Sequence, residues 1–474
     1  MRSPALVSQP TDRAYIGPAI LLVLGLFIFG IFSSNPLAYI FVLFATVLPI
    51  GIWLNFGATG IPIFPAVSAL YFVYYGLPIL RGSVEIYDDA EIQRGAATVA
   101  GFLISASLAW FLIGVRRVIR RRGGRDAASD PQVKLIVILG LSAGIFYYIA
   151  QESGWLWWLG FYIGVLRSVA LTFASVACYL LGYARARGTL KGPLFIVSVS
   201  GVIILVVLAW ASLFLVGGVL HIAAALLGYI LTKKKIPWVT IVAMFVLATV
   251  LHAGKETMRK NNWFAHSQVN MASSITSLPS MIVEWIGTGI EELISGNKRE
   301  GGLIERTSLL HMLLYVQHAT PESIPYLGGK TYVLMLSTLT PRFLDAEKTS
   351  SQSGLNYLSV RYGLQSEESA KNTTIAWGIP AEAFANFGYS GIIGVGLVFG
   401  ALCAFFTRIS VGVSPISFPM LIAISTTVNL LNIEANFGYL LLNIGQSVIS
   451  VFLFLLPLKL FRTKNTSVTA RATL

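Results

Sequence analysis

The sequence predicts an all-α polytopic membrane protein with about twelve transmembrane helices and one large, partly helical loop outside the membrane. Of its 474 residues, 55% are hydrophobic and 12% are charged, which is about half the charged fraction of a soluble domain. The mean hydropathy is +0.73. This composition excludes an ordinary soluble enzyme. The two cysteines, Cys178 and Cys403, lie in apolar runs, so we expect neither a disulfide framework nor a cysteine-rich metal site.

Twelve apolar stretches are long enough to cross a bilayer, which requires about 17–25 residues of helix. The first follows Arg2 and Arg13, as a signal peptide would, but no small-residue cleavage site comes after it, so we predict an anchor. The third begins with Pro62 and Pro65 and either spans the membrane or re-enters it. The stretches are 15–32, 36–54, 61–80, 95–115, 134–150, 158–183, 194–210, 213–231, 236–253, 388–408, 415–433 and 437–458.

The basic residues orient these spans, because positive charge is retained on the cytoplasmic side during insertion. With twelve spans and a cytoplasmic N-terminus, every basic cluster beside a span falls on that side. Changing the count by one breaks this agreement, so we predict that both termini are cytoplasmic. The clusters are Arg116, Arg117, Arg120, Arg121, Arg122 and Arg125; Arg185, Arg187 and Lys191; Lys233, Lys234 and Lys235; Arg408; and Lys459, Arg462 and Lys464.

One long polar segment, 254–387, separates a bundle of about nine spans at 1–253 from three spans and a cytoplasmic tail at 388–474. It holds 12 of the 21 acidic residues but 11 of the 34 basic ones, so the net charge of +13 belongs to the cytoplasmic edges. That distribution indicates membrane topology rather than nucleic-acid binding. Long loops in compact proteins are usually functional, and we expect the chemistry here.

Two helices are predicted inside this loop. Apolar residues recur at helical spacing from Leu278 to Ile294, with polar residues opposite them, which is typical of a helix lying on the membrane surface. A second helix is expected from about Leu303 to His318, with His311 and His318 on its polar face.

A five-residue repeat, Ala-Asn-Phe-Gly-Tyr, occurs at 385–389 and again at 435–439. Each copy opens a predicted span at its outer end and follows an acid, Glu382 or Glu434. The asparagines are either helix caps or substrate ligands. The two glutamates favour a functional role, because an acid at the membrane edge is costly without a partner.

Several chemistries lack the residues they require. No nucleophile elbow, His-Glu-x-x-His zinc pattern, Walker A loop or dinucleotide fingerprint occurs, so we predict no metal and no cofactor. The short loop 81–94 does place Glu85, Asp88, Asp89 and Glu91 together. These acids form either a solvated patch, which we favour, or a site for a divalent cation with substrate phosphates.

Cations in the long loop suit a phosphate ligand, because arginine binds phosphates through paired hydrogen bonds. Solvated charge pairs, such as Glu305 with Arg306, are expected to account for about half of them. The others predict a site for the diphosphate of a lipid-linked substrate at the bilayer edge. The candidates are Arg259, Arg306, Arg342, Arg361, Lys255, Lys260 and Lys330.

Two stretches of this loop resemble a known family. Pro341-Arg342-Phe343, and the segment from Pro380 to Gly391 that contains Glu382, are similar to the Wzy-type polymerases of O-antigen, capsule and exopolysaccharide repeat units. The resemblance is architectural over the whole chain and extends to single residues across about 303–395.

The resemblance implies a multi-pass enzyme of the bacterial inner membrane whose large loop is periplasmic. Such an enzyme moves a growing glycan en bloc from undecaprenyl diphosphate onto a hydroxyl of the next lipid-linked repeat unit, without nucleotide sugars. It also implies membrane lipid, a flippase and a chain-length-regulating membrane protein as partners.

The chemistry of this transfer assigns roles to the candidate residues. We expect Arg306, Arg342 and Arg361 to stabilise charge on the departing diphosphate. Glu382 is the predicted base for the incoming hydroxyl, ahead of Glu434 and His311. The other expected substrate contacts are Arg259, Lys330, Tyr332 and Asn386.

Three other functions use parts of the same sequence. A ligase that moves finished glycan from the same lipid to another acceptor needs the same arginines. A metal-dependent transferase that uses single lipid-phosphate sugars needs the acids of the 81–94 loop. A transporter or flippase usually has inverted repeats and charges at mid-membrane, whereas polarity here concentrates in one loop, so we rank it last.

Overall fold

The computed structural model describes residues 16–55, 60–84, 86–115, 130–233, 235–263, 272–295, 308–339 and 352–453. Over these residues the chain is helical and contains no strand, which confirms the predicted all-α class. Nine helices in this part of the chain are long and apolar enough to cross a membrane. The protein is therefore a polytopic helical membrane protein by the length and composition of its helices.

The nine long segments coincide with nine of the predicted spans. They are α2 (Pro36–Asn55), α3 with η2 and α4 (Ile63–Leu80), α5 with η3 (Asp89–Val115), α7 (Asp130–Glu152), α8 (Ile163–Arg187), α9 (Pro193–Trp210), α10 (Leu215–Lys233), α11 (Trp238–Trp263) and α18 (Ile379–Ile409).

Three shorter apolar helices occupy the other predicted positions: α1 (Ile16–Ile31), α19 (Phe418–Leu430) and a last helix, Phe437–Leu453. The 13 residues of α19 reach only about 20 Å, which is short of the roughly 30 Å hydrocarbon core of a bilayer. Twelve crossings therefore stay a prediction.

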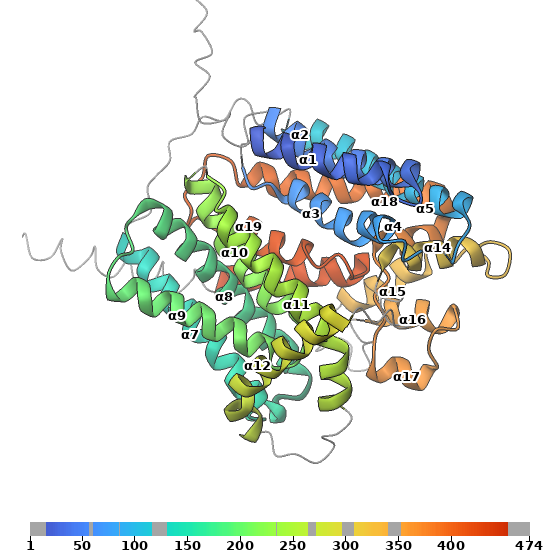
Figure 1. Cartoon of the computed structure of the whole chain (residues 1–474). Coiled ribbons are helices and arrows are strands. Elements are labelled where there is room, and N and C mark those ends of the chain that lie inside the picture. Colours follow the sequence, from blue (N-terminus) through green and yellow to red (C-terminus); the bar gives the residue numbers. More distant parts are fainter. Residues whose placement is uncertain are drawn as a thin grey trace, which may run out of the picture.

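The long helices pack in two groups, around α5 and around α8. α5 lies against α2 and α18, and α8 lies against α7 and α10 (Figure 1). Small residues permit these close approaches. A Cβ atom at Gly400 of α18 would collide with the Ala106 backbone of α5, and one at Gly182 of α8 would collide with the Ala225 carbonyl of α10.

The stretch at 61–80 forms one helical segment of 18 residues, which favours a span over a re-entrant loop. Pro62 precedes the helix and Pro65 lies in its first turn, where a missing N–H leaves no hydrogen bond unmade. A π-helical turn, η2 (Phe72–Gly76), follows and places Tyr74 and Tyr75 in its middle. Such turns are frequent at functional sites.

Contacts between helix ends agree with the predicted order of crossings. The Ile61 N–H donates to Ser410 Oγ over 2.9 Å, and both residues belong to predicted cytoplasmic ends. The Arg259 guanidinium donates to the Leu213 carbonyl over 2.9 Å, and both of these belong to predicted outer ends. The contacts therefore pair ends of the same predicted side. Which side faces the cytoplasm stays a prediction.

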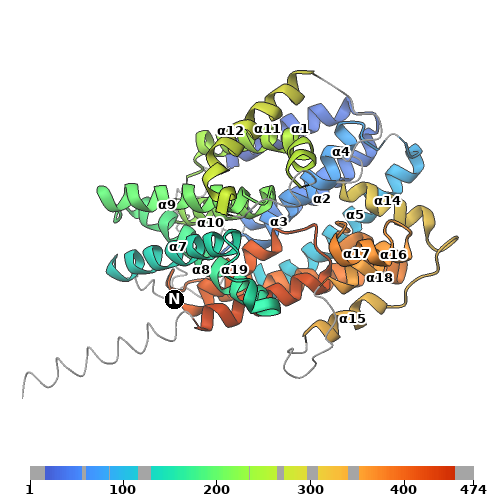
Figure 2. The same cartoon turned by 90° about the horizontal axis from the view of Figure 1, so that it is seen from below.

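Where the structure describes it, the segment predicted as a single loop contains five helices between α11 and α18: α12 (Ala272–Ser295), α14 (Leu309–Ala319), α15 (Lys330–Leu339), α16 (Ser353–Arg361) and α17 (Glu367–Asn372). α14 to α17 lie together at the right of both views, away from α7, α8 and α9 (Figures 1 and 2). Both neighbouring helices extend into the segment: α11 continues past the predicted limit of 253, and α18 starts before the predicted limit of 388. The early start of α18 follows from Pro380, which is favoured in the first turn of a helix.

α12 packs on α11 with one face and leaves the other exposed. Trp285 is fully buried and donates to the Leu251 carbonyl over 2.7 Å, while Val283, Leu293 and Ile294 are exposed. The predicted helix at 278–294 therefore exists and is longer. Its Trp285 face covers α11 rather than lipid, and its outward apolar face retains the character expected of a membrane-surface helix.

Candidate functional site

The two repeat copies meet through one buried carboxylate. Glu382, in the first turn of α18, is 0% exposed. Its Oε1 accepts from Asn436 Nδ2 over 3.2 Å, and its Oε2 accepts from the Phe437 backbone N–H over 2.8 Å. Because Phe437 begins the last helix, the carboxylate satisfies a backbone N–H that the helix itself leaves unpaired. The Glu382 side chain thus joins α18 to that helix.

The second repeat copy is a helix cap, as one of the two interpretations predicted. Asn436 Oδ1 accepts from the Tyr439 N–H over 3.1 Å at the start of the last helix.

The first copy is not a cap, because α18 begins at Ile379 and Asn386 lies inside it. Asn386 Oδ1 instead accepts from the Gly329 N–H over 3.1 Å, and its Nδ2 donates to Thr331 Oγ1 over 2.8 Å. The helix bends at Gly388, whose φ of +62° suits glycine.

Tyr332 fills the space between the aromatic residues of the two copies. Its ring lies 5.9 Å from that of Phe387 with an interplanar angle of 3°, and 6.4 Å from that of Phe437 in an edge-on arrangement. Burial, with the nearby charge of Glu382, raises the pKa of the Tyr332 phenol well above its usual value. The Tyr332 phenol is therefore neutral at neutral pH, and its buried hydroxyl has no hydrogen-bond partner among the described residues.

The second glutamate has a different environment. Glu434 is partly buried, and its Oε1 accepts from the Tyr74 hydroxyl over 2.8 Å. Lys255 and Arg259, one turn apart on α11, repel each other, and Glu434 attracts both. The sequence-predicted Arg259, on α11, and Glu434, in the turn before the last helix, thus interact although they lie more than 170 positions apart in the chain.

Further groups extend this cation cluster. The Arg259 guanidinium lies over the Phe214 ring, 4.7 Å from its centroid, and makes a cation–π contact with it. Arg81, after α4, acts electrostatically on His252 of α11, as do Lys255 and Arg259. The arrangement is a cluster of cations that contains one carboxylate and one tyrosine hydroxyl.

The other predicted residues take separate places. The Lys330 ammonium lies over the Tyr357 ring at 4.8 Å, and Arg361 is exposed at the end of α16. His311 lies beside the Tyr87 ring, 5.3 Å between centroids. Its helix starts at Leu309 rather than Leu303, because Ser308 caps it by accepting from the His311 N–H.

Two predicted catalytic arginines, Arg306 and Arg342, lie outside the described residues. Their roles stay predictions.

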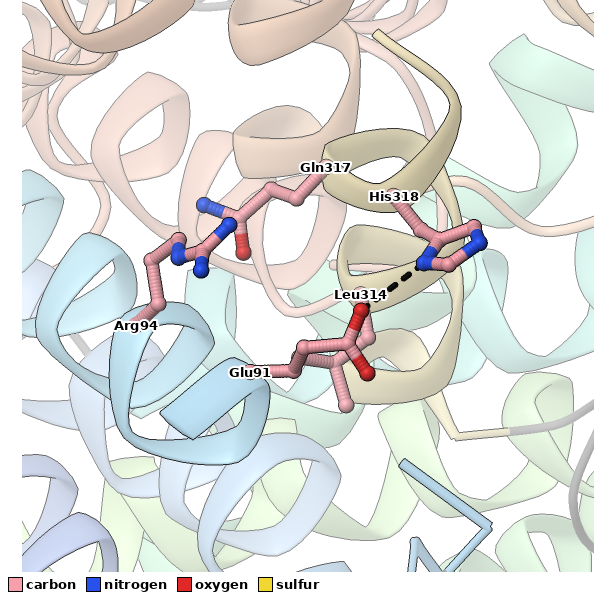
Figure 3. Close-up of a pocket in the computed structure, with 5 residues that line it drawn as sticks. All are labelled: Glu91, Arg94, Leu314, Gln317 and His318. Carbon is pink, nitrogen blue, oxygen red and sulfur yellow. Dashed lines mark hydrogen bonds and ion pairs between the residues drawn. The ribbon is translucent and has the colours of Figure 1, made fainter. Parts of the chain in front are cut away.

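The acids of the 81–94 loop have structural partners. Asp88 and Glu91 form a capping box at the start of α5, and Asp89 accepts from Asn35 over 2.9 Å. Glu91 also pairs with His318 over 2.8 Å, beside Arg94 and Gln317 (Figure 3). Glu85 lies outside the described residues. Across the described part of the chain, no group of three metal-binding side chains occurs.

Sequence reasoning missed Tyr74, Thr331 and the buried position of Glu382. The four-residue spacing of Lys255 and Arg259 predicts that both lie on one face of a helix. No sequence pattern predicts the π-helical turn that carries Tyr74. Comparison of the chain with known protein families, with curated proteins and with solved structures finds no match.

Proposed function

We propose that the protein is a membrane glycosyltransferase that polymerises polyprenyl-diphosphate-linked oligosaccharide repeat units on the periplasmic face. One observation carries the proposal. The Glu434 carboxylate lies among the Tyr74 hydroxyl and the cations Lys255 and Arg259, at the end of the bundle where both repeat copies lie.

The cations bind the diphosphate of the lipid-linked donor. Lys255 and Arg259 together carry one more charge than the Glu434 carboxylate beside them, and their mutual repulsion is costly in a partly buried place. A diphosphate relieves that repulsion and is bound in turn by charge-assisted hydrogen bonds. Arg306 and Arg342 remain the expected further contacts from the loop.

Glu434 is the better placed proton acceptor. Glu382 is fully buried and uses both carboxylate oxygens to hold Asn436 and Phe437. Glu434 is partly exposed, and only its Oε1 has a hydrogen bond among the described residues, from the Tyr74 hydroxyl. We therefore assign Glu434 as the base, and Glu382 as a positioning residue for the last helix.

The transfer then follows from these positions. The acceptor hydroxyl oxygen bonds to the anomeric carbon of the growing glycan while the bond from that carbon to the diphosphate oxygen breaks. The hydroxyl proton passes to Glu434, and the lipid diphosphate leaves on the cations. The lipid-linked oligosaccharide is thus both donor and acceptor, and the proposed location is the bacterial inner membrane.

The experiment is reconstitution of the purified protein in lipid nanodiscs with lipid-linked repeat units. Chain length is read from the glycan ladder on a gel. We expect a ladder of repeats with release of free lipid diphosphate, and no effect of EDTA. Transfer of preformed glycan to another acceptor, with no ladder from single repeats, would identify a ligase instead.

A further inference from the structure

Exposed cations gather where α8 and α10 end. Ser175 of α8 lies beside His221 of α10, with 3.4 Å between Oγ and Nδ1, and Gly182 lies against Ala225 further along both helices. The two helices therefore run in the same direction and finish at the same end of the bundle. The exposed cations at this end are Arg185, Arg187, Lys191, Lys233 and Lys235.

The chain around these cations supplies no acid to balance them. The sequence has no Asp or Glu from 153 to 255, a stretch that holds all of α8, α9 and α10 and most of α11. α7 packs along α8 and is joined to it by the short segment 153–162, so it begins where α8 ends. It brings one acid and one base, Asp130 and Lys134, which cancel. Like charges gathered at one end repel one another, and an anion bound among them relieves that repulsion.

Aromatic rings hold two of the arginines in place. The Arg185 guanidinium lies over the Phe195 ring of α9, 4.6 Å from its centroid. Arg187 Nη1 donates to the Tyr183 hydroxyl over 2.6 Å. A long cationic side chain loses conformational freedom when it binds an anion, so a guanidinium that a ring already holds loses less.

An apolar surface that fits acyl chains starts beside the cations. Ile196 and Val197, near the start of α9, are each 65% exposed, and the exposed Ile203 and Ile204 continue this face two turns further on. Trp238 begins α11 at the same end and is 41% exposed, and tryptophan is enriched at the level of lipid headgroups. A free anion or a nucleic acid uses the cations alone, whereas a phospholipid uses the cations and the apolar face.

We propose that the end of the bundle where α8 meets α9 is a binding site for a phospholipid with an anionic headgroup. The headgroup phosphate binds Arg185, the neighbouring cations add to the positive field, and the acyl chains lie along the exposed face of α9. The site does not depend on the proposed function, because Arg259 lies at the far end of α11, about 30 Å from Trp238 by the rise of an α-helix.

Native mass spectrometry of the full-length protein in detergent tests this site. Phosphatidylglycerol and phosphatidylcholine with the same acyl chains are added in equal amounts, so the two lipids differ only in their headgroups. We expect the protein to retain about ten-fold more phosphatidylglycerol than phosphatidylcholine. This preference should shrink as the salt concentration rises, because salt screens exposed charges.

Two variants and a control locate the site. Arg185→Ala is expected to lower phosphatidylglycerol binding roughly five-fold, through the loss of one cation near the headgroup. Phe195→Leu keeps every charge but removes the ring that holds Arg185, and should lower binding about two-fold. Arg408→Ala is the matched control, because it removes one exposed cation from the end of α18, in the helix group around α5. Arg185 is exposed, so Arg185→Ala keeps the test valid if Phe195→Leu does not fold.

Three results would overturn the proposal. Equal retention of the two lipids would show that the headgroup charge is not recognised. Binding by Arg185→Ala and Phe195→Leu at the level of the Arg408→Ala control would show that the lipid responds to overall charge and not to this site. Displacement of phosphatidylglycerol by millimolar inorganic phosphate would identify a site for a free anion in place of a lipid. None of these results bears on ladder formation, so the polymerase proposal stands or falls separately.

Discussion

Glu382 and Glu434 each precede one copy of the repeat, but their surroundings differ. Glu382 is enclosed and held by an amide and a backbone N–H, whereas Glu434 is partly exposed beside a tyrosine and two cations. A carboxylate with both oxygens engaged and no exposed surface holds its neighbours in place, whereas a partly exposed one can be reached by an acceptor hydroxyl, which is why Glu434 is the proposed base.

Substitution separates these two roles. Glu434→Gln is expected to lower the polymerisation rate by about 10²–10⁴-fold, because it removes the base. We expect a smaller fall of the melting temperature than in Glu382→Gln, because the attraction to Lys255 and Arg259 is lost but no buried hydrogen bond to backbone is. Glu382→Gln is expected to lower the melting temperature as well, since the new amide presents a donor to Asn436 Nδ2, a loss of about 1–3 kcal/mol. The measurements are ladder formation and thermal unfolding of the same preparations. Loss of activity in Glu382→Gln at an unchanged melting temperature would instead make Glu382 the base.

Substitution of Arg259 tests the binding of the lipid-linked donor. Arg259→Lys keeps the charge but loses the planar contact with Phe214 and the paired hydrogen bonds that a guanidinium makes with a diphosphate. We expect the Kd for the lipid-linked donor to rise about ten-fold, measured by titration in nanodiscs. Lys260→Ala is the control, because Lys260 is exposed and pairs only with Glu256 one turn away in the described structure. Equal effects of the two variants would remove Arg259 from the site.

At the scale of elements, α11 and α12 cross at a pair of glycines. A Cβ atom at Gly289 of α12 would collide with the Val250 carbonyl of α11, and one at Gly254 would lie 2.8 Å from the Gly289 nitrogen. This crossing holds the α11 helix, with its cations, against α12. Small residues also permit close packing between α5 and α18 and between α8 and α10.

Alanine at neighbouring glycines of α12 is expected to act in opposite directions. Gly289→Ala should destabilise the protein by about 1–3 kcal/mol through overpacking. Gly287→Ala, with nothing within 4 Å of the added Cβ, should be neutral or stabilising by up to about 1 kcal/mol through helix propensity. Thermal unfolding in one detergent compares the two. A stabilising Gly289→Ala would mean that α11 and α12 do not pack this closely.

At the scale of the whole molecule, the proposal requires that the end with Glu382 and Glu434 faces the periplasm. Cys178 and Cys403 are buried, so we expect little labelling of the native cysteines. We expect Glu322→Cys, on the exposed turn after α14, to react with a membrane-impermeant maleimide in intact spheroplasts. Lys191→Cys, between α8 and α9, should react only after permeabilisation. The reversed pattern would place the proposed site in the cytosol and end the polymerase proposal.

Hydropathy along the chain was sufficient for the helical class and for the position of each apolar helix, while the number of crossings and their orientation stay predictions. These properties are local, because the bilayer demands a long apolar helix wherever the chain crosses it. The repeat, its two acids and Arg259 were also visible in the sequence. Tertiary structure alone decided that Glu382 reaches Phe437 across 55 positions, that Asn386 holds the turn before α15, and that Tyr74 meets Glu434. Such contacts depend on how helices are turned against one another, and that rotation is set by close packing of many side chains at once rather than by any local pattern.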